Sequence, residues 1–167
     1  YQETIKHYKQ SGDLDSGNGD ASRSLGDAYF CSDMPRKALQ AYRKALTDHP
    51  KNADAHFSLA EFWINYARIP AAIRAMEKAV RCDPDRHYYR YRLGDLYTIM
   101  GKFHAARYQY KRAVTLAPDD AFYHYKLGDL YARMTQWDRA VKSYERAVEC
   151  SPAEEFYSFR LSAAYIQ

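Results

Sequence analysis

Residues 87–120, HYYRYRLGDLYTIMGKFHAARYQYKRAVTLAPDD, carry a pattern that returns every thirty-four residues along the chain. Its marker residues are Leu93, Gly94, Tyr110 and Pro118. One period later the same positions hold Leu127, Gly128, Tyr144 and Pro152; one period earlier, Leu59, Ala60, Met76 and Pro84; and two periods earlier, Leu25, Gly26, Tyr42 and Pro50. A strict period of this length predicts an all-α solenoid that stacks one helical hairpin per repeat.

The residues of one period also predict where its helices begin and end. A first helix is expected over residues 88–100, and Gly101 supplies a left-handed turn residue that a Cβ would resist. A second helix is expected over residues 103–116, and Pro118 ends it because the residue before a proline avoids the helical region. Pro35 and Pro70 fall near the start of their second helices, where a missing N–H costs nothing.

The repeat borders divide the chain into six predicted segments. Four full repeats are expected over 19–52, 53–86, 87–120 and 121–154, and residues 155–167 form the first helix of a fifth repeat or a capping helix. Residues 1–18 are predicted to hold a short amphipathic helix over 1–10, followed by a flexible loop rich in Gly, Asp, Ser and Asn.

The motif and its spacing resemble the tetratricopeptide repeat family over residues 19–167. The pattern departs mildly from that family where glycine is lost, at Ala60 and Ser162. The resemblance implies a right-handed superhelical solenoid of antiparallel helix hairpins. It also implies a protein-binding role, because members of this family mostly bind other proteins through varied surfaces.

Composition narrows the functional classes. The formal net charge of +4 is modest and does not by itself indicate nucleic-acid binding. Three cysteines cannot complete a disulfide framework, which favours a reducing compartment, and we expect a cytoplasmic protein. No apolar run reaches the length of a membrane span. The chain begins without Met and ends within a repeat, which leaves a longer protein with a leader or anchor open.

Motifs of catalysis are not found in the sequence. It has no phosphate-binding loop, no nucleophile elbow and no paired-histidine zinc motif. We therefore expect no enzyme activity of its own, no cofactor and no metal site.

The first helices leave two rows of side chains once the packing positions are removed. In the resembled family these positions face the concave groove that receives peptide ligands. The aromatic row comprises Phe57, Tyr91, Tyr125 and Phe159, and the acidic row comprises Asp27, Glu61, Asp95 and Asp129. Further candidate groove residues are Asn65, Tyr88, Phe122 and Arg133.

These rows predict the class of partner. Aromatic residues that packing does not use are candidate binding anchors. Family members that grip a C-terminal carboxylate use Asn at the acidic-row position, so acids there favour a basic or neutral segment with apolar anchors. A competing interpretation is that cations at helical spacing neutralise the row, in the pairs Arg23–Asp27, Arg92–Asp95 and Lys126–Asp129.

The second helices carry a basic face where no packing is expected. Its members are Arg43, Lys44, Lys78, Arg81, Lys111, Arg112, Lys142 and Arg146. The simplest interpretation is that these charges are solvated. The alternatives are that the face binds an acidic protein, an anionic membrane surface or RNA. Aromatic residues lie on the other helices, which argues against a nucleic-acid groove.

The sequence therefore predicts a non-catalytic scaffold that binds a peptide or helix of a partner protein, within a multiprotein complex or as its assembly factor. Two alternatives stay open. The chain is a substrate-recruiting or regulatory segment of a larger enzyme, or it self-associates through its C-terminal helix.

Overall fold

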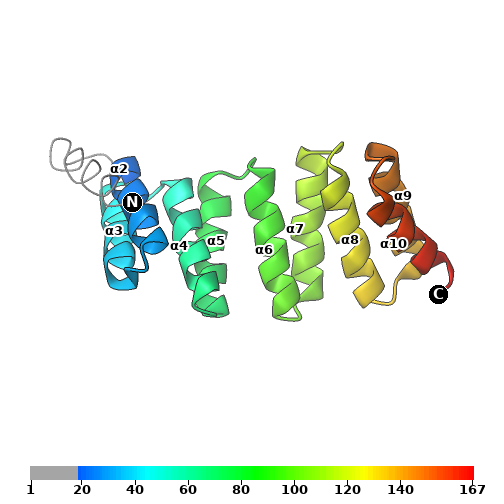
Figure 1. The fold of residues 1–167 in the computed structure, drawn as a ribbon, viewed down its shortest axis with the longest axis horizontal. Helices are drawn as coiled ribbons and strands as arrows, with labels where there is room; N and C mark the ends of the chain where they lie inside the picture. The colour runs from blue at the N-terminus through cyan, green and yellow to red at the C-terminus, as the bar shows by residue number, and fades with distance from the viewer. Residues whose placement is uncertain (1–18) are drawn as a thin grey trace. The chain divides into compact units, whose positions relative to one another are not determined.

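The computed structural model describes residues 19–167, and all regular elements in that range are α-helices. They are α2 (Gly19–Cys31), α3 (Pro35–Asp48), α4 (Ala53–Asn65), α5 (Ile69–Cys82), α6 (His87–Ile99), α7 (Phe103–Leu116), α8 (Ala121–Arg133), α9 (Trp137–Cys150) and α10 (Glu155–Tyr165) (Figure 1). The all-α prediction is confirmed. The helix and loop predicted for residues 1–18 lie outside the described residues.

Neighbouring helices pair as hairpins within two compact units, the first ending at Pro84 and the second beginning at Asp85. In the first unit α2 packs on α3 and α4 on α5, and in the second α6 packs on α7, α8 on α9, and α10 on α9. Helices α6 and α7 each begin and end within one residue of the positions that the sequence predicts. Pro35 and Pro70 lie in the first positions of α3 and α5, as predicted.

The turn inside each hairpin uses a left-handed residue at one repeat position. Gly101 has φ 70°, and the equivalent residues Asp33, Ala67 and Thr135 have φ 54°, 53° and 56°. Lys102 N donates to Tyr97 O at 2.8 Å across this turn, which closes the end of α6. The sequence identified the left-handed position only at Gly101. Ala67 and Thr135 are not residues that the conformation favours, and Asp33, which tolerates it, was not recognised.

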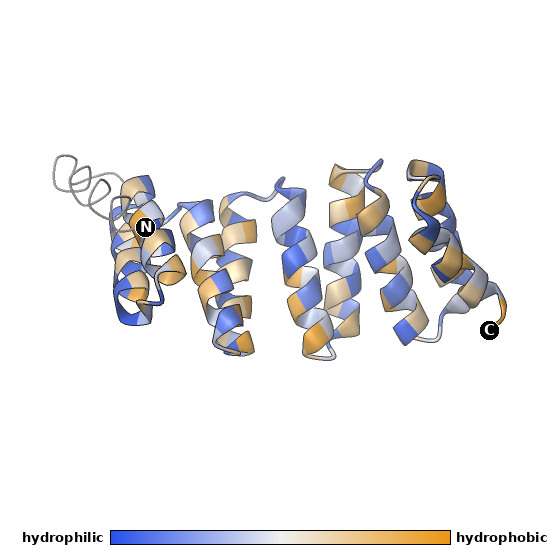
Figure 2. Ribbon diagram, in the orientation of Figure 1, coloured by the Kyte–Doolittle hydropathy of each residue, from blue (hydrophilic) through white to orange (hydrophobic). Residues whose placement is uncertain are grey.

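Each hairpin is held by small residues on one helix and a large side chain on the other. Ala106 and Ala113 of α7 are completely buried. Gly94 is required by Tyr110, because a Cβ at residue 94 would lie 2.6 Å from the Tyr110 ring. Apolar and polar residues alternate around each helix, as expected where one face packs and another meets solvent (Figure 2).

Two histidines stabilise the chain segment that precedes a first helix. His56 Nε2 lies 2.9 Å from Pro50 O, and His124 Nε2 lies 2.8 Å from Pro118 O. Both side chains are buried, and burial lowers the pKa of His56. Their recurrence at twice the repeat length therefore reflects packing within the repeat.

Within residues 19–167, no helix combines the length and the apolar character that crossing a membrane requires.

Candidate functional site

Three of the four acidic-row residues accept a hydrogen bond from a tyrosine of the second helix in their own hairpin. Tyr110 donates its hydroxyl to Asp95 Oδ1 at 2.5 Å. The equivalent bonds, Tyr42 to Asp27 and Tyr144 to Asp129, each measure 2.7 Å. We call this contact the Tyr–Asp link. It gives the acids a structural role that their position in the sequence did not reveal.

The link keeps the tyrosine hydroxyl protonated. Burial raises the pKa of Tyr110 above its ordinary value, and the charge of Asp95 and the hydrogen bond to it act in the same direction. Burial, followed by the hydrogen bond to the carboxylate, likewise raises the pKa of Tyr42 and Tyr144. The neutral tyrosine hydroxyl is therefore the donor of this hydrogen bond at neutral pH.

Cations from the following repeat meet the same acids in the second unit. Lys126 Nζ of α8 lies 2.9 Å from Asp95 Oδ1, and Arg160 of α10 forms an ion pair with Asp129. Sequence spacing placed Lys126 beside Asp129 instead. In the structure Lys126 reaches back to α6, because Asp95 lies close to it in space across the repeat border.

In the first unit the neutralising pair stays within one helix. Arg23 Nη1 lies 2.8 Å from Asp27 Oδ2, as the spacing of four residues predicts. Asp27, Asp95 and Asp129 therefore each lie beside positive charge. This arrangement supports the competing interpretation, in which cations reduce the negative field of the acidic row.

Aromatic rings of α6, α8 and α10 form a continuous row across the second unit. The distances between successive ring centroids are 5.8 Å for Tyr88–Tyr91, 5.1 Å for Tyr91–Phe122, 6.2 Å for Phe122–Tyr125 and 5.1 Å for Tyr125–Phe156. We call these five residues the aromatic ladder. Tyr88, Phe122 and Phe156 are 39%, 38% and 46% exposed, so the ladder offers apolar surface to a ligand.

In the structure Phe156, and not Phe159, is the residue of α10 that joins the aromatic row. Phe159, which the sequence assigned to the row, is 68% exposed, and no ring contact joins it to its described neighbours. Phe156 packs on Tyr125 instead. Phe156 lies one period after Phe122 and two after Tyr88, and this spacing was the sequence signal that could have identified it.

The half-buried members of the ladder are also bound to the acids. Burial, followed by hydrogen bonding to Asp129, raises the pKa of Tyr125 to about 12. Burial and hydrogen bonding to Asp95 raise the pKa of Tyr91 in the same way. These two rings are therefore fixed by the hairpins, while the exposed edges of the ladder remain available.

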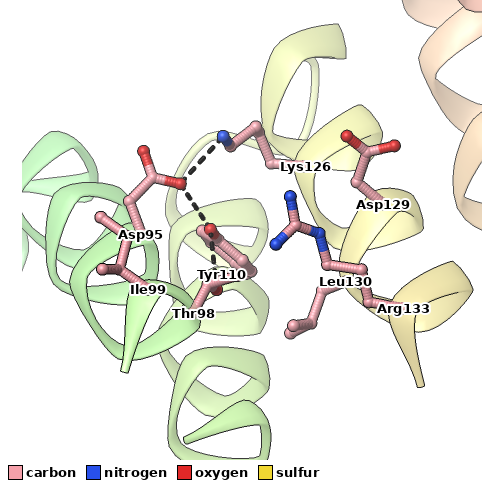
Figure 3. Close-up of a pocket in the computed structure, with 8 residues that line it drawn as sticks. All are labelled: Asp95, Thr98, Ile99, Tyr110, Lys126, Asp129, Leu130 and Arg133. Carbon is pink, nitrogen blue, oxygen red and sulfur yellow. Dashed lines mark hydrogen bonds and ion pairs between the residues drawn. The ribbon is translucent and has the colours of Figure 1, made fainter. Parts of the chain in front are cut away.

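A cavity of ≈ 260 Å³ lies beside the Tyr–Asp link of α6 and α7. Figure 3 shows Lys126 and Tyr110 both bonded to Asp95 at its edge. Asp129 and the exposed Arg133 line it from α8. Of the predicted residues, Asp95, Asp129 and Arg133 thus line one cavity between α6 and α8, whereas Phe159 of α10 does not.

The predicted first-unit residues form a separate local surface. Asp27, Phe57 and Glu61 line a cavity of ≈ 350 Å³ together with Arg23. Asn65 is exposed at the last position of α4 and is not among the residues around this cavity.

Comparisons with known proteins agree with this architecture. A tetratricopeptide repeat model matches residues 32–93, a TPR repeat model matches residues 94–134, and a second tetratricopeptide repeat model matches residues 121–154. Together the three models cover most of the chain. A search of curated proteins gives no match.

Several solved structures share the fold. A crystal structure of MamA is 24% identical, with 92% of this chain and 90% of that chain covered and a TM-score of 0.79. YrrB, described as a TPR protein with an unusual peptide-binding site, is 20% identical, with 95% and 81% covered and a TM-score of 0.77. TTC0263, a thermophilic TPR protein of Thermus thermophilus, is 18% identical, with 98% and 89% covered and a TM-score of 0.69. At these identities the likeness establishes the fold alone.

Proposed function

Because the chain belongs to the tetratricopeptide repeat family, we propose that it is a non-catalytic protein-interaction scaffold that holds a peptide or helix of a partner protein. In this proposal the aromatic ladder of the second unit is the binding surface, and the scaffold works within a multiprotein complex or assembles one. The family supports the interaction role, and the partly exposed ladder is the observation that carries the choice of surface.

The ladder favours a ligand with apolar or aromatic side chains. Tyr88, Phe122 and Phe156 each expose more than a third of their surface yet lie against half-buried rings that fix their positions. Preorganised aromatic anchors lose little conformational entropy when a ligand docks. YrrB, which shares the fold, is described as having a peptide-binding site, and this supports the same class of ligand here.

The surrounding charges favour a neutral ligand over a strongly basic one. Asp95 and Asp129 already bind Lys126 and Arg160, so a basic ligand would have to compete with cations of the chain itself. Lys126 Nζ also lies 5.6 Å from the centroid of the Tyr91 ring, next to the ladder. We therefore narrow the predicted basic or neutral segment to a neutral one.

Peptide selection tests this proposal directly. Peptides from a random library are selected on the immobilised chain, and their affinities are measured by calorimetry for the wild type and for Y88A/F122A/F156A. Truncating three anchors is expected to weaken binding by tenfold or more, since single hot-spot residues contribute about 2 kcal/mol. A double variant, Y165A/I166A, removes exposed apolar side chains outside the ladder and is expected to bind as the wild type does.

Equal helical content of the three proteins, measured by circular dichroism, is required for the comparison. Peptides that bind the wild type and the ladder variant equally well would show that the ladder is not the binding surface. Failure to select any peptide would contradict the peptide-binding role itself.

Self-association through α10 is a second candidate, favoured by the apolar surface of that helix. Phe159 is 68% exposed, Tyr165 63% and Ile166, directly after α10, 83%. Large apolar side chains exposed close together in the sequence are candidates for an interaction site. Sedimentation velocity over a hundredfold range of concentration tests it: a rising sedimentation coefficient that F159D abolishes supports self-association, and a constant monomer excludes it.

A further inference from the structure

The second unit contains another cavity, formed by α7, α8 and α9, with a volume of ≈ 640 Å³. Arg107 and Lys111 of α7 and Arg139 and Lys142 of α9 line it, and none of its lining residues is acidic. The cavity shares no lining residue with the one beside the ladder. It is therefore a separate feature of the molecule.

The four cations are not compensated within the described part of the chain. Arg139 donates to the neutral Gln136 Oε1 at 2.9 Å, and its guanidinium lies 5.8 Å from the centroid of the Tyr131 ring. None of the four forms an ion pair with a carboxylate among residues 19–167. Like charges gathered around a hollow create a positive potential that attracts and retains anions.

Two of the four cations are particular to this site. Two repeats earlier the positions of Lys111 and Lys142 hold Arg43 and Arg74, whereas those of Arg107 and Arg139 hold Leu39 and Ala71. A solvated basic face, the simplest interpretation of the sequence, would not require four cations around one cavity. The local concentration of charge points instead to a ligand.

We propose that this cavity binds an acidic peptide segment of a partner protein. Its volume lies within the range of about 300–1,000 Å³ that ligand sites commonly have. Tyr108, which is 59% exposed, lies among the cations and offers a surface for an apolar side chain of the peptide. The fitting ligand therefore combines several Asp or Glu side chains with at least one apolar side chain.

The site favours a peptide over single-stranded RNA. Its cations Lys111, Arg139 and Lys142 are exposed and therefore accessible to an extended acidic chain that lies in the hollow. Single-stranded RNA binds along a groove that presents successive aromatic rings. Here Tyr108 is the exposed aromatic side chain among the lining residues. Acidic protein is thus the ligand class that both the charge and the shape support.

Fluorescence anisotropy with a defined probe tests the proposal. The probe is a fluorescein-labelled peptide, acetyl-Glu-Glu-Phe-Glu-Glu-Phe-amide, and its affinity is measured for the wild type and for R107E/K111E/K142E. The charge reversal is expected to weaken binding by at least tenfold. A peptide with Gln in place of every Glu is expected to bind the wild type at least tenfold more weakly than the acidic probe.

A matched variant controls for net charge. K44E/K51E/R81E reverses three exposed cations of the first unit, which changes the total charge of the chain equally. It is expected to keep the affinity for the acidic probe within about twofold, because none of the three residues lines the cavity and salt screens exposed charges. Equal losses in the two variants would show that the probe senses total charge only and would overturn the proposal.

Two further arms separate the ligand classes. Vesicles containing phosphatidylserine and a fluorescein-labelled oligouridylate are titrated against the wild type and both variants. The assignment to a peptide would be overturned if the wild type bound the vesicles or the oligouridylate more tightly than the acidic peptide and R107E/K111E/K142E lost that binding. The peptide proposal also fails if the wild type does not bind the acidic probe, whatever the ladder binds, because the two surfaces share no residue.

Discussion

Repeats 53–86 and 87–120 build the same hairpin with different parts. In the later repeat Gly94, Asp95 and Tyr110 form one set: the glycine leaves room for the ring, and the ring carries a hydroxyl to the acid. In the earlier repeat the three positions hold Ala60, Glu61 and Met76, and Met76 is completely buried.

The difference teaches that these three positions change together. An alanine in place of the glycine would leave no room for an aromatic ring at its present position, and a methionine, which is flexible and unbranched, can fill the remaining space. Because Met76 has no hydroxyl, it cannot donate to Glu61 the hydrogen bond that Tyr110 donates to Asp95. The four predictions below break or sharpen this comparison.

Alkaline pH is expected to have the largest effect, because it acts on three linked repeats at once. The pKa values of Tyr42, Tyr110 and Tyr144 lie above the ordinary 10.0 in the folded chain. The unfolded chain therefore loses these protons first. The stability is fully present below about pH 10 and is lost as the pH rises toward the folded-state values.

Urea unfolding at about pH 8 and about pH 11 measures this loss. The variant G94A/Y110M, which carries the Ala–Met pair of the earlier repeat, is expected to lose less free energy of unfolding over the same interval. An equal loss in both proteins would mean that Tyr110 does not contribute.

Gly94→Ala is expected to lower the free energy of unfolding by about 2 kcal/mol, although alanine is the better helix former. Its Cβ would lie 2.6 Å from the Tyr110 ring, which must then move. Chemical denaturation measures the change. Adding Y110M to this variant is expected to recover most of the loss, and no recovery would contradict the pairing of the two positions.

Tyr110→Phe keeps the ring and removes only the hydroxyl. The expected loss is about 1.5 kcal/mol, because Asp95 loses a hydrogen bond in a half-buried site. Tyr108→Phe, a change at a 59% exposed side chain, is expected to have an effect below about 0.5 kcal/mol. Equal effects would show that the hydroxyl of Tyr110 is not special.

Lys126→Met is expected to have the smallest effect. It should lower the free energy of unfolding by about 0.5 kcal/mol at low salt and by less at high salt. The ion pair with Asp95 measures 2.9 Å but remains partly exposed, so solvent screens it. Denaturation at two ionic strengths measures this dependence. A loss that does not change with salt would indicate a packing role for the aliphatic part of Lys126.

The helices were predicted well from the sequence because the residues that begin and end them act locally. Gly101 and the prolines act within a few residues of their own positions, so their effect can be inferred without knowledge of the fold. It did not predict the left-handed turns at Ala67 and Thr135, where the stacked hairpin imposes a conformation that the residue does not favour.

The candidate site was predicted less completely, because its contacts cross between helices. The acidic row could be listed from its repeat spacing, but Tyr110 was assigned to packing alone, and nothing in a spacing of fifteen residues reveals a shared hydrogen bond. Lys126 likewise had a plausible partner on its own helix and pairs across the repeat border instead. Local spacing cannot decide between such partners.

The Tyr–Asp link also constrains how this scaffold can evolve. Asp95 belongs at once to the surface beside the ladder and to the joint between α6 and α7, so a mutation that alters its charge also loosens the hairpin. Residues 88, 122 and 156 take no part in a Tyr–Asp link, and their side chains are already partly exposed. On the proposed binding surface, ligand preference could therefore change at these three positions while the acids that join the hairpins stay fixed.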